Sequence, residues 1–198
     1  MEVSEYDPLI VWFDDALEKD FCKKIIRKFN KDDRKEPGHT GLGYSPDIKQ
    51  SLDLVISHCE DWKEEDQVFF KSLNARLKEY STYAEEEYGL RCPLDIDTGY
   101  QMQKTTPGGF YHWHHDFSIT NQRWRSLTYI WYLNTPRKGH TEFSCGESIK
   151  PETGKLVLFP ATWDRLHRGT PPETMKYICT GWLYKDEPKE EEEQEQEE

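Results

Sequence analysis

Three histidines and an aspartate fall within five consecutive positions of the segment FYHWHHDF, residues 110–117. Imidazole and carboxylate groups bind divalent metals and transfer protons, so this segment is a candidate site of chemistry. If the segment is a strand, its side chains alternate between two faces, which places His112 and His114 on the same face as Asp116. His115 then faces the other way. We therefore expect His114 and Asp116 to form a chelating pair.

A third ligand has to come from elsewhere in the chain. The best placed histidine is His167, because it follows a strand candidate and a short loop in the segment LVLFPATWDRLHRG. The other distant histidines are His39, His58 and His140. Two imidazoles and one carboxylate on one face of a metal leave three positions open, which is the arrangement of non-haem Fe(II) oxygenases. The open positions admit a bidentate cosubstrate and O2.

Lys176 lies nine residues after His167, at the start of the segment KYICTGWLY. On strand alternation it shares a face with Ile178, Thr180 and Trp182, a mostly apolar face that we expect to be interior. A buried lysine is costly unless an anion pairs with it. The sequence therefore predicts that a carboxylate ligand lies beside Lys176.

Hydrophobic periodicity divides the chain into a helical part and a strand-rich part. Residues 9–13 (LIVWF) predict a strand, and Asp14 and Asp15 are the expected N-caps of a helix that follows. A second helix is predicted over about residues 65–88, ending at Gly89. Beyond Gly89, segments rich in Val, Ile, Thr and aromatic residues predict closely spaced strands. The expected fold class is α+β, mainly β, with an antiparallel sandwich or barrel supported by N-terminal helices.

Length and composition predict one domain over residues 1–185 and an acidic tail over residues 186–198. The tail contains nine acidic residues and one lysine, so it carries most of the net charge of −12 and is expected to be disordered. The five cysteines show no CxxC spacing, and no apolar run is long enough to span a membrane. These features predict a cytoplasmic protein with neither a nucleic-acid nor a membrane partner, and they leave the oligomeric state open.

Five segments, taken in order, resemble motifs of the Fe(II)- and 2-oxoglutarate-dependent dioxygenases, in particular the prolyl 4-hydroxylase-like branch. These segments are GGFYHWHHD, RSLTYIWYLN, GHTEF, IKPETGKLVLFP and LHRGTPPETMKYICTGW. The resemblance covers about residues 97–184, and more loosely the first predicted helix. It implies a double-stranded β-helix core of the jelly-roll, cupin-like kind.

The resemblance also implies roles for particular residues. His114, Asp116 and His167 match the iron ligands, and no catalytic residue is implied beyond this metal centre. The cosubstrate-binding residues implied are Lys176 and Tyr132, which match groups holding the distal carboxylate of 2-oxoglutarate, together with Thr128, which shares the strand parity of Tyr132, and Tyr100. Tyr100 or Gln103 is proposed to supply a contact to the cosubstrate or substrate, because Thr105 stands where many relatives have a tyrosine.

The implied activity is hydroxylation of a C–H bond with release of succinate and CO2, using Fe(II), 2-oxoglutarate and O2, with ascorbate in a supporting role. A prolyl residue in a protein or peptide is the expected target. Two alternatives stay open: hydroxylation of a free amino acid or another small metabolite, and a cupin-like metal-binding or sensing module without catalysis. A cation nine residues beyond the last ligand argues against the module, because mere metal binding does not require it.

Overall fold

The computed structural model describes residues 1–41, 43–92, 96–120 and 123–186. Of the acidic tail predicted over residues 186–198, all but Asp186 lies outside the described residues. No helix in the described part of the chain combines the length and the apolar character that a membrane span requires.

The first helix starts later than the sequence predicts. Strands β1 (Glu2–Val3) and β2 (Val11–Phe13) precede helix α1 (Lys19–Lys31), whose N-cap is Glu18, with no side-chain capping hydrogen bond. The prediction that Asp14 and Asp15 cap this helix is wrong. Asp15 has a φ of 52°, and the Leu17 N–H donates to the distant Gly154 carbonyl oxygen at 3.1 Å. The segment before α1 is therefore fixed by a long-range contact instead of a local cap.

The second helix confirms the prediction from periodicity. Two 3-10 turns, η1 (Ile56–His58) and η2 (Glu60–Trp62), lead into α2 (Lys63–Tyr88). Gly89 ends α2 in the left-handed conformation, with a φ of 66°, and its N–H donates to the Glu85 carbonyl oxygen at 3.0 Å. The buried side chains of α2 recur at helical spacing: Glu65, Phe69, Leu73, Leu77, Tyr80 and Ala84.

Among the described residues, ten strands form a large antiparallel sheet. Its order is β1-β2-β14-β11-β16-β8-β6-β3, with β10 paired to β11 and β7 paired to β16. The further strands are β3 (Glu36–Pro37), β6 (Leu52–Val55), β7 (Ile96–Asp97), β8 (Gln101–Thr105), β10 (Ile119–Thr120), β11 (Arg123–Tyr132), β14 (Leu156–Pro160) and β16 (Lys176–Asp186).

A smaller antiparallel sheet faces the large one and has the order β13-β12-β15-β9. A separate hairpin pairs β4 with β5. Their bounds are β4 (His39–Thr40), β5 (Gly43–Tyr44), β9 (Tyr111–His114), β12 (Thr141–Phe143), β13 (Ser148–Ile149) and β15 (His167–Gly169). The expectation of an α+β, mainly β chain with antiparallel sheets and supporting helices is confirmed.

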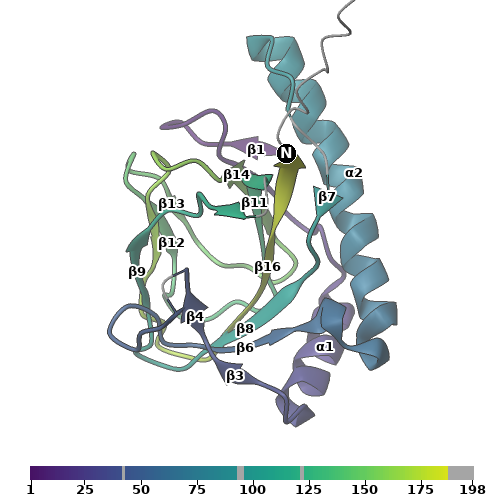
Figure 1. The fold of residues 1–198 in the computed structure, drawn as a ribbon, viewed down its shortest axis with the longest axis vertical. Helices are drawn as coiled ribbons and strands as arrows, with labels where there is room; N and C mark the ends of the chain where they lie inside the picture. Colours follow the sequence, from purple (N-terminus) through teal and green to yellow (C-terminus); the bar gives the residue numbers. More distant parts are fainter. Residues whose placement is uncertain (42, 93–95, 121–122, 187–198) are drawn as a thin grey trace, which may run out of the picture.

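Strand alternation divides the core into two layers. On β11, Tyr129 and Trp131 face the helices, and the Trp131 ring lies 5.1 Å from that of Phe69 on α2. The intervening Ile130 and Tyr132 face the small sheet and join a second cluster. Figure 1 shows both helices on the same side of the strands. The large sheet therefore packs the helices on one face and encloses the space between the sheets with the other.

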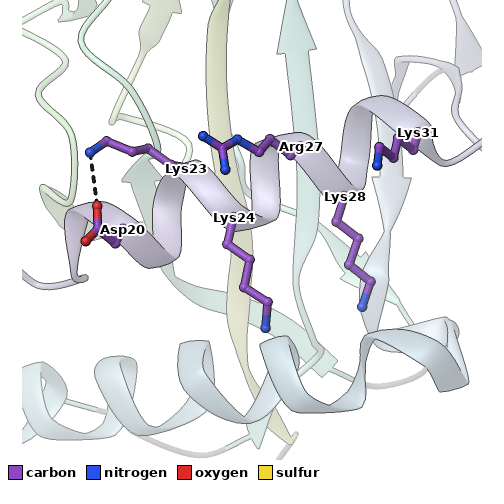
Figure 2. A pocket seen from close by; sticks show the side chains of 6 residues that line it. All are labelled: Asp20, Lys23, Lys24, Arg27, Lys28 and Lys31. Carbon is purple, nitrogen blue, oxygen red and sulfur yellow. Dashed lines mark hydrogen bonds and ion pairs between the residues drawn. The ribbon is translucent and has the colours of Figure 1, made fainter.

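Helix α1 carries a basic outward face. Lys23, Arg27 and Lys31 extend from one side of it, while Lys24 and Lys28 extend towards α2 (Figure 2). Lys28 Nζ lies 2.6 Å from Oε2 of the buried Glu65, which ties the two helices together. The basic side chains line a hollow of about 550 Å³ on the helix layer. This layer covers the opposite face of the large sheet from the small sheet, so the hollow is separate from the interior between the sheets.

Gly181 on β16 provides a test of the packing on the helix-facing side of the large sheet. A Cβ atom there would lie 2.4 Å from Oη of Tyr129 and 2.5 Å from the Gly99 carbonyl oxygen, two atoms that share a hydrogen bond. We expect Gly181→Ala to lower the free energy of unfolding by about 1–3 kcal/mol, measured by urea denaturation. Gly41→Ala is the control, because no atom of the described residues, apart from those adjacent in the chain, lies within 4 Å of its added Cβ. Equal stability of the two variants would contradict this packing.

Candidate metal centre

The pairing of β15 with β9 places His167 directly opposite His114. Asp116 follows β9 by two residues and is buried. One ligand atom from each of these three residues lies within 4.8 Å of the other two. The structure thus brings together the three residues that the sequence singled out.

Backbone hydrogen bonds orient both imidazoles. His114 Nδ1 lies 2.8 Å from the His112 carbonyl oxygen, and His167 Nδ1 lies 3.0 Å from the Arg165 carbonyl oxygen. A carbonyl only accepts, so each Nδ1 is the donor and each Nε2 keeps a free lone pair. The two Nε2 atoms approach the carboxylate of Asp116, at 3.8 Å from Oδ1 for His114 and 3.6 Å from Oδ2 for His167. All three ligand groups therefore converge on one point.

Neighbours on the large sheet hold Asp116. The Thr128 hydroxyl on β11 donates to Asp116 Oδ2 at 2.8 Å. Arg125 Nη1 donates to the backbone carbonyl oxygen of Asp116 at 3.3 Å, while its guanidinium lies 3.6 Å from the Trp182 ring centroid and its Nε donates to the Tyr184 hydroxyl. The carboxylate is thus fixed through both its side chain and its backbone.

Electrostatics favour a neutral His114 imidazole beside an ionised Asp116 carboxylate. Burial lowers the pKa of His114 to about 3, and repulsion by His167 contributes to that shift. Burial by itself would raise the pKa of Asp116. Electrostatic attraction by His167 and His114 and the hydrogen bond from Thr128 outweigh this effect, so the pKa lies below the ordinary value. Neutral imidazole and ionised carboxylate are the forms that bind a divalent metal.

A β-bulge changes which side chains face the site. Between Tyr111 and His114 the strand β9 has one more residue than the segment of β15 paired with it. The Tyr111 ring consequently stacks on that of His114, with centroids 3.5 Å apart and planes 14° apart. His112 is exposed, which corrects the expectation from strict alternation that it shares the inward face of His114. His115 is exposed as well.

The predicted cosubstrate residues are only partly brought to this interior. Lys176 begins β16 and is buried, with its Nζ 5.5 Å from the Tyr132 ring centroid. No carboxylate in the described part of the chain pairs with Lys176, and burial lowers its pKa to about 8. The Tyr132 hydroxyl donates to Thr141 Oγ1 at 2.6 Å. Thr128 faces the interior as expected, but its hydroxyl is bonded to Asp116.

The assignment of Tyr100 to cosubstrate binding needs correction. Its ring packs against Phe69 and Trp131 in the helix layer, and its hydroxyl donates to Asp97 Oδ2 at 3.0 Å. It therefore lies on the opposite face of the large sheet from the metal centre. Gln103, the alternative considered for this contact, pairs in register with Ile178 and faces the interior.

Residues 100–184 match the sequence family described as the 2OG-Fe(II) oxygenase superfamily. That segment belongs to this superfamily. It includes the three converging residues as well as Lys176 and Tyr132. The oxygenases of this superfamily use Fe(II), 2-oxoglutarate and O2, and the donor set of two imidazoles and a carboxylate fits Fe(II). A search of curated proteins found no significant match to the chain.

Solved structures of prolyl hydroxylases share the fold of this chain. A Trichoplax adhaerens prolyl hydroxylase in complex with a hypoxia inducible factor peptide fragment matches at a TM-score of 0.70 and 17% identity, over 90% of this chain and 84% of that one. A Pseudomonas putida prolyl-4-hydroxylase matches at 0.65 and 17%, over 89% and 93%.

The viral collagen prolyl hydroxylase of Paramecium Bursaria Chlorella virus-1, in its 2OG complex, matches at a TM-score of 0.61 and 18% identity, over 89% of this chain and 96% of that one. These likenesses confirm the expected double-stranded β-helix core.

Thr128 tests how the carboxylate is held. We expect Thr128→Val to weaken Fe(II) binding about tenfold, because loss of a hydrogen bond to a metal-ligating carboxylate loosens its orientation. Thr128→Ser keeps the hydroxyl and serves as the control. The measurement is anaerobic titration calorimetry with Fe(II). Equal affinities of the Val and Ser variants would show that this hydrogen bond does not orient Asp116.

Proposed function

We propose that this chain is an Fe(II)- and 2-oxoglutarate-dependent dioxygenase that hydroxylates a prolyl residue in a protein or peptide, with release of succinate and CO2. The observation that carries this proposal is a triad of two Nε2 atoms and one carboxylate that shares the interior between the sheets with a buried, unpaired lysine. A structural metal site does not require the lysine, whereas an enzyme with a dicarboxylate cosubstrate does.

His114, Asp116 and His167 are proposed to hold Fe(II) from one side. Each imidazole offers Nε2, because its Nδ1 is committed to a backbone carbonyl. The Phe143 and Phe159 rings lie 5.7 and 4.8 Å from the His167 ring and shield it from water. Fe(II) with 2-oxoglutarate and O2 supplies the oxidising power for C–H hydroxylation.

Lys176 is proposed to anchor the distal carboxylate of 2-oxoglutarate. Its ammonium group is buried without a carboxylate partner among the described residues, so a bound dicarboxylate supplies the missing charge. Gly139 leaves room for the lysine, because a Cβ there would lie 3.3 Å from Lys176 Cδ. Tyr132 is proposed to add a hydrogen bond by turning its hydroxyl proton from Thr141 Oγ1 to the carboxylate.

The prolyl target is supported by the fold shared with three prolyl hydroxylases. A free amino acid or another small metabolite stays the alternative target, because specificity depends on loops that differ between enzymes of one fold. A sensing module without catalysis is the remaining alternative, and the unpaired Lys176 argues against it.

The Lys176 assignment predicts a pH dependence. Below a pKa of about 8 the amine is charged and binds an anion, and the charge is lost as the pH rises through that value. We expect kcat/KM for 2-oxoglutarate to fall above about pH 8. Lys176→Arg should remove this alkaline loss, since arginine stays protonated. Lys176→Ala should raise the 2-oxoglutarate KM at least about thirtyfold at neutral pH.

Lys150→Ala is the matched control, because Lys150 is exposed and forms an ion pair with the partly exposed Glu152. Succinate release at varied 2-oxoglutarate concentration measures both effects. An unchanged KM in the Lys176→Ala variant would remove this lysine from the proposed role.

The substrate experiment is incubation with Fe(II), ascorbate, 2-oxoglutarate and either proline-containing peptides or free amino acids. We expect succinate formation together with a peptide product heavier by one oxygen atom in mass spectrometry. The His114→Ala and His167→Ala variants should form neither. Oxidation confined to free amino acids would support the alternative target, and the absence of any succinate would support the sensing module.

A further inference from the structure

A buried ion pair lies beside the metal centre and has no part in the function proposed above. Lys49 Nζ lies 2.7 Å from Asp53 Oδ2, and the two side chains are 5% and 6% exposed. Removing two charges from water costs several kcal/mol per ion, and their attraction only partly offsets that cost. Such a pair is weak evidence for stability, so its position in the molecule suggests another purpose.

The pair joins the two sheets. Asp53 belongs to β6 of the large sheet, where it is paired in register with Gln103 and faces the interior. The segment around Lys49 runs along the edge of β9 in the small sheet. There Gln50 N–H donates to the Phe110 carbonyl oxygen at 2.8 Å, and His112 N–H donates to the Ile48 carbonyl oxygen at 2.9 Å. The Lys49 side chain thus crosses from the edge of one sheet to a carboxylate of the other.

The same lysine contacts the ring that packs on a metal-binding histidine. Lys49 Nζ lies 5.3 Å from the centroid of the Tyr111 ring, within the range of a cation–π contact. The Tyr111 ring also stacks on the imidazole of His114, with centroids 3.5 Å apart. A continuous chain of contacts therefore runs from Asp53 through Lys49 and Tyr111 to the imidazole of His114.

The fit around the pair is close. A Cβ on Gly38 would lie 2.2 Å from Ser51 Oγ, 2.9 Å from Lys49 Cε and 3.0 Å from Asp53 Oδ2. The Lys49 ammonium also lies 3.4 Å from the His39 carbonyl oxygen. These contacts limit the directions in which the lysine can extend, and they favour the one over the Tyr111 ring.

We propose that Lys49 and Asp53 are positioning residues of the metal centre, which hold Tyr111 against His114 and thereby aim His114 Nε2 at the metal. The inference rests on the proposed iron site. A stacked ring restricts rotation of the imidazole about its side-chain bonds, and the hydrogen bond from Nδ1 to the His112 carbonyl oxygen restricts it further. The β-bulge in β9 is what places Tyr111 on the face of His114.

The test is Fe(II) affinity measured by anaerobic titration calorimetry, supported by the visible spectrum of the Co(II)-substituted protein. Lys49→Met/Asp53→Asn removes both charges together, which avoids an unpaired buried charge. We expect it to bind Fe(II) about tenfold more weakly and to show an altered Co(II) spectrum. Tyr111→Leu should show a loss of similar size, and Tyr111→Phe, which keeps the ring, should recover most of it.

The combined Lys49→Met/Asp53→Asn/Tyr111→Leu variant should be no weaker than Tyr111→Leu alone, because the pair acts through the ring. The matched control is Lys28→Met/Glu65→Gln, which removes an ion pair from the helix layer. That control should lose thermal stability but keep its Fe(II) affinity.

The positioning role would be overturned if the combined variant lost Fe(II) affinity by the product of the two separate losses. Unchanged Fe(II) affinity in Lys49→Met/Asp53→Asn would overturn it as well. Failure of the proposed function gives a different result, in which the unmodified protein does not bind Fe(II) or His167→Ala does not weaken binding.

Discussion

The structure depends on keeping one carboxylate ionised in a buried position. Asp116 is buried between the two sheets, where an isolated charge is strongly unfavourable. Two imidazoles from neighbouring strands of the small sheet and a hydroxyl from the large sheet surround it, so both sheets have to be correctly paired before the charge is compensated. A divalent cation held by His114, Asp116 and His167 would complete the compensation. Metal binding at this site would therefore stabilise the paired arrangement of the two sheets.

Much of this site could be predicted from the chain alone. His114 and Asp116 are two residues apart, and the segment ending at His167 carries the pattern of a strand and a loop. The burial of Lys176 could be expected because the residues that share its face of the strand, Ile178, Thr180 and Trp182, are mostly apolar. In each case the information is local, because strand periodicity fixes which face a side chain occupies.

The features that escaped prediction depend on partners distant in sequence. The start of α1 is set by a bond between Leu17 and Gly154, and the inward turn of Tyr111 is set by a bulge in the pairing with β15. Tyr100 shares the face of Met102 in the helix layer, so the alternation of β8 already favoured Gln103 as the interior residue. The ion pair of Lys49 with Asp53 had no local signal, since the lysine lies in an irregular segment.

Strand β11 serves two unrelated layers through alternate residues. Tyr129 and Trp131 support the helices, while Thr128 and Tyr132 serve the interior. Deleting or inserting a single residue between Thr128 and Tyr132 would exchange the two sets, placing aromatic rings in the interior between the sheets and polar groups beneath the helices. The stretch from Thr128 to Tyr132, which lies beyond the bulge between Arg125 and Leu127, is therefore free to change by replacement of residues but not by change of length. Variation in length is left to the connections around it.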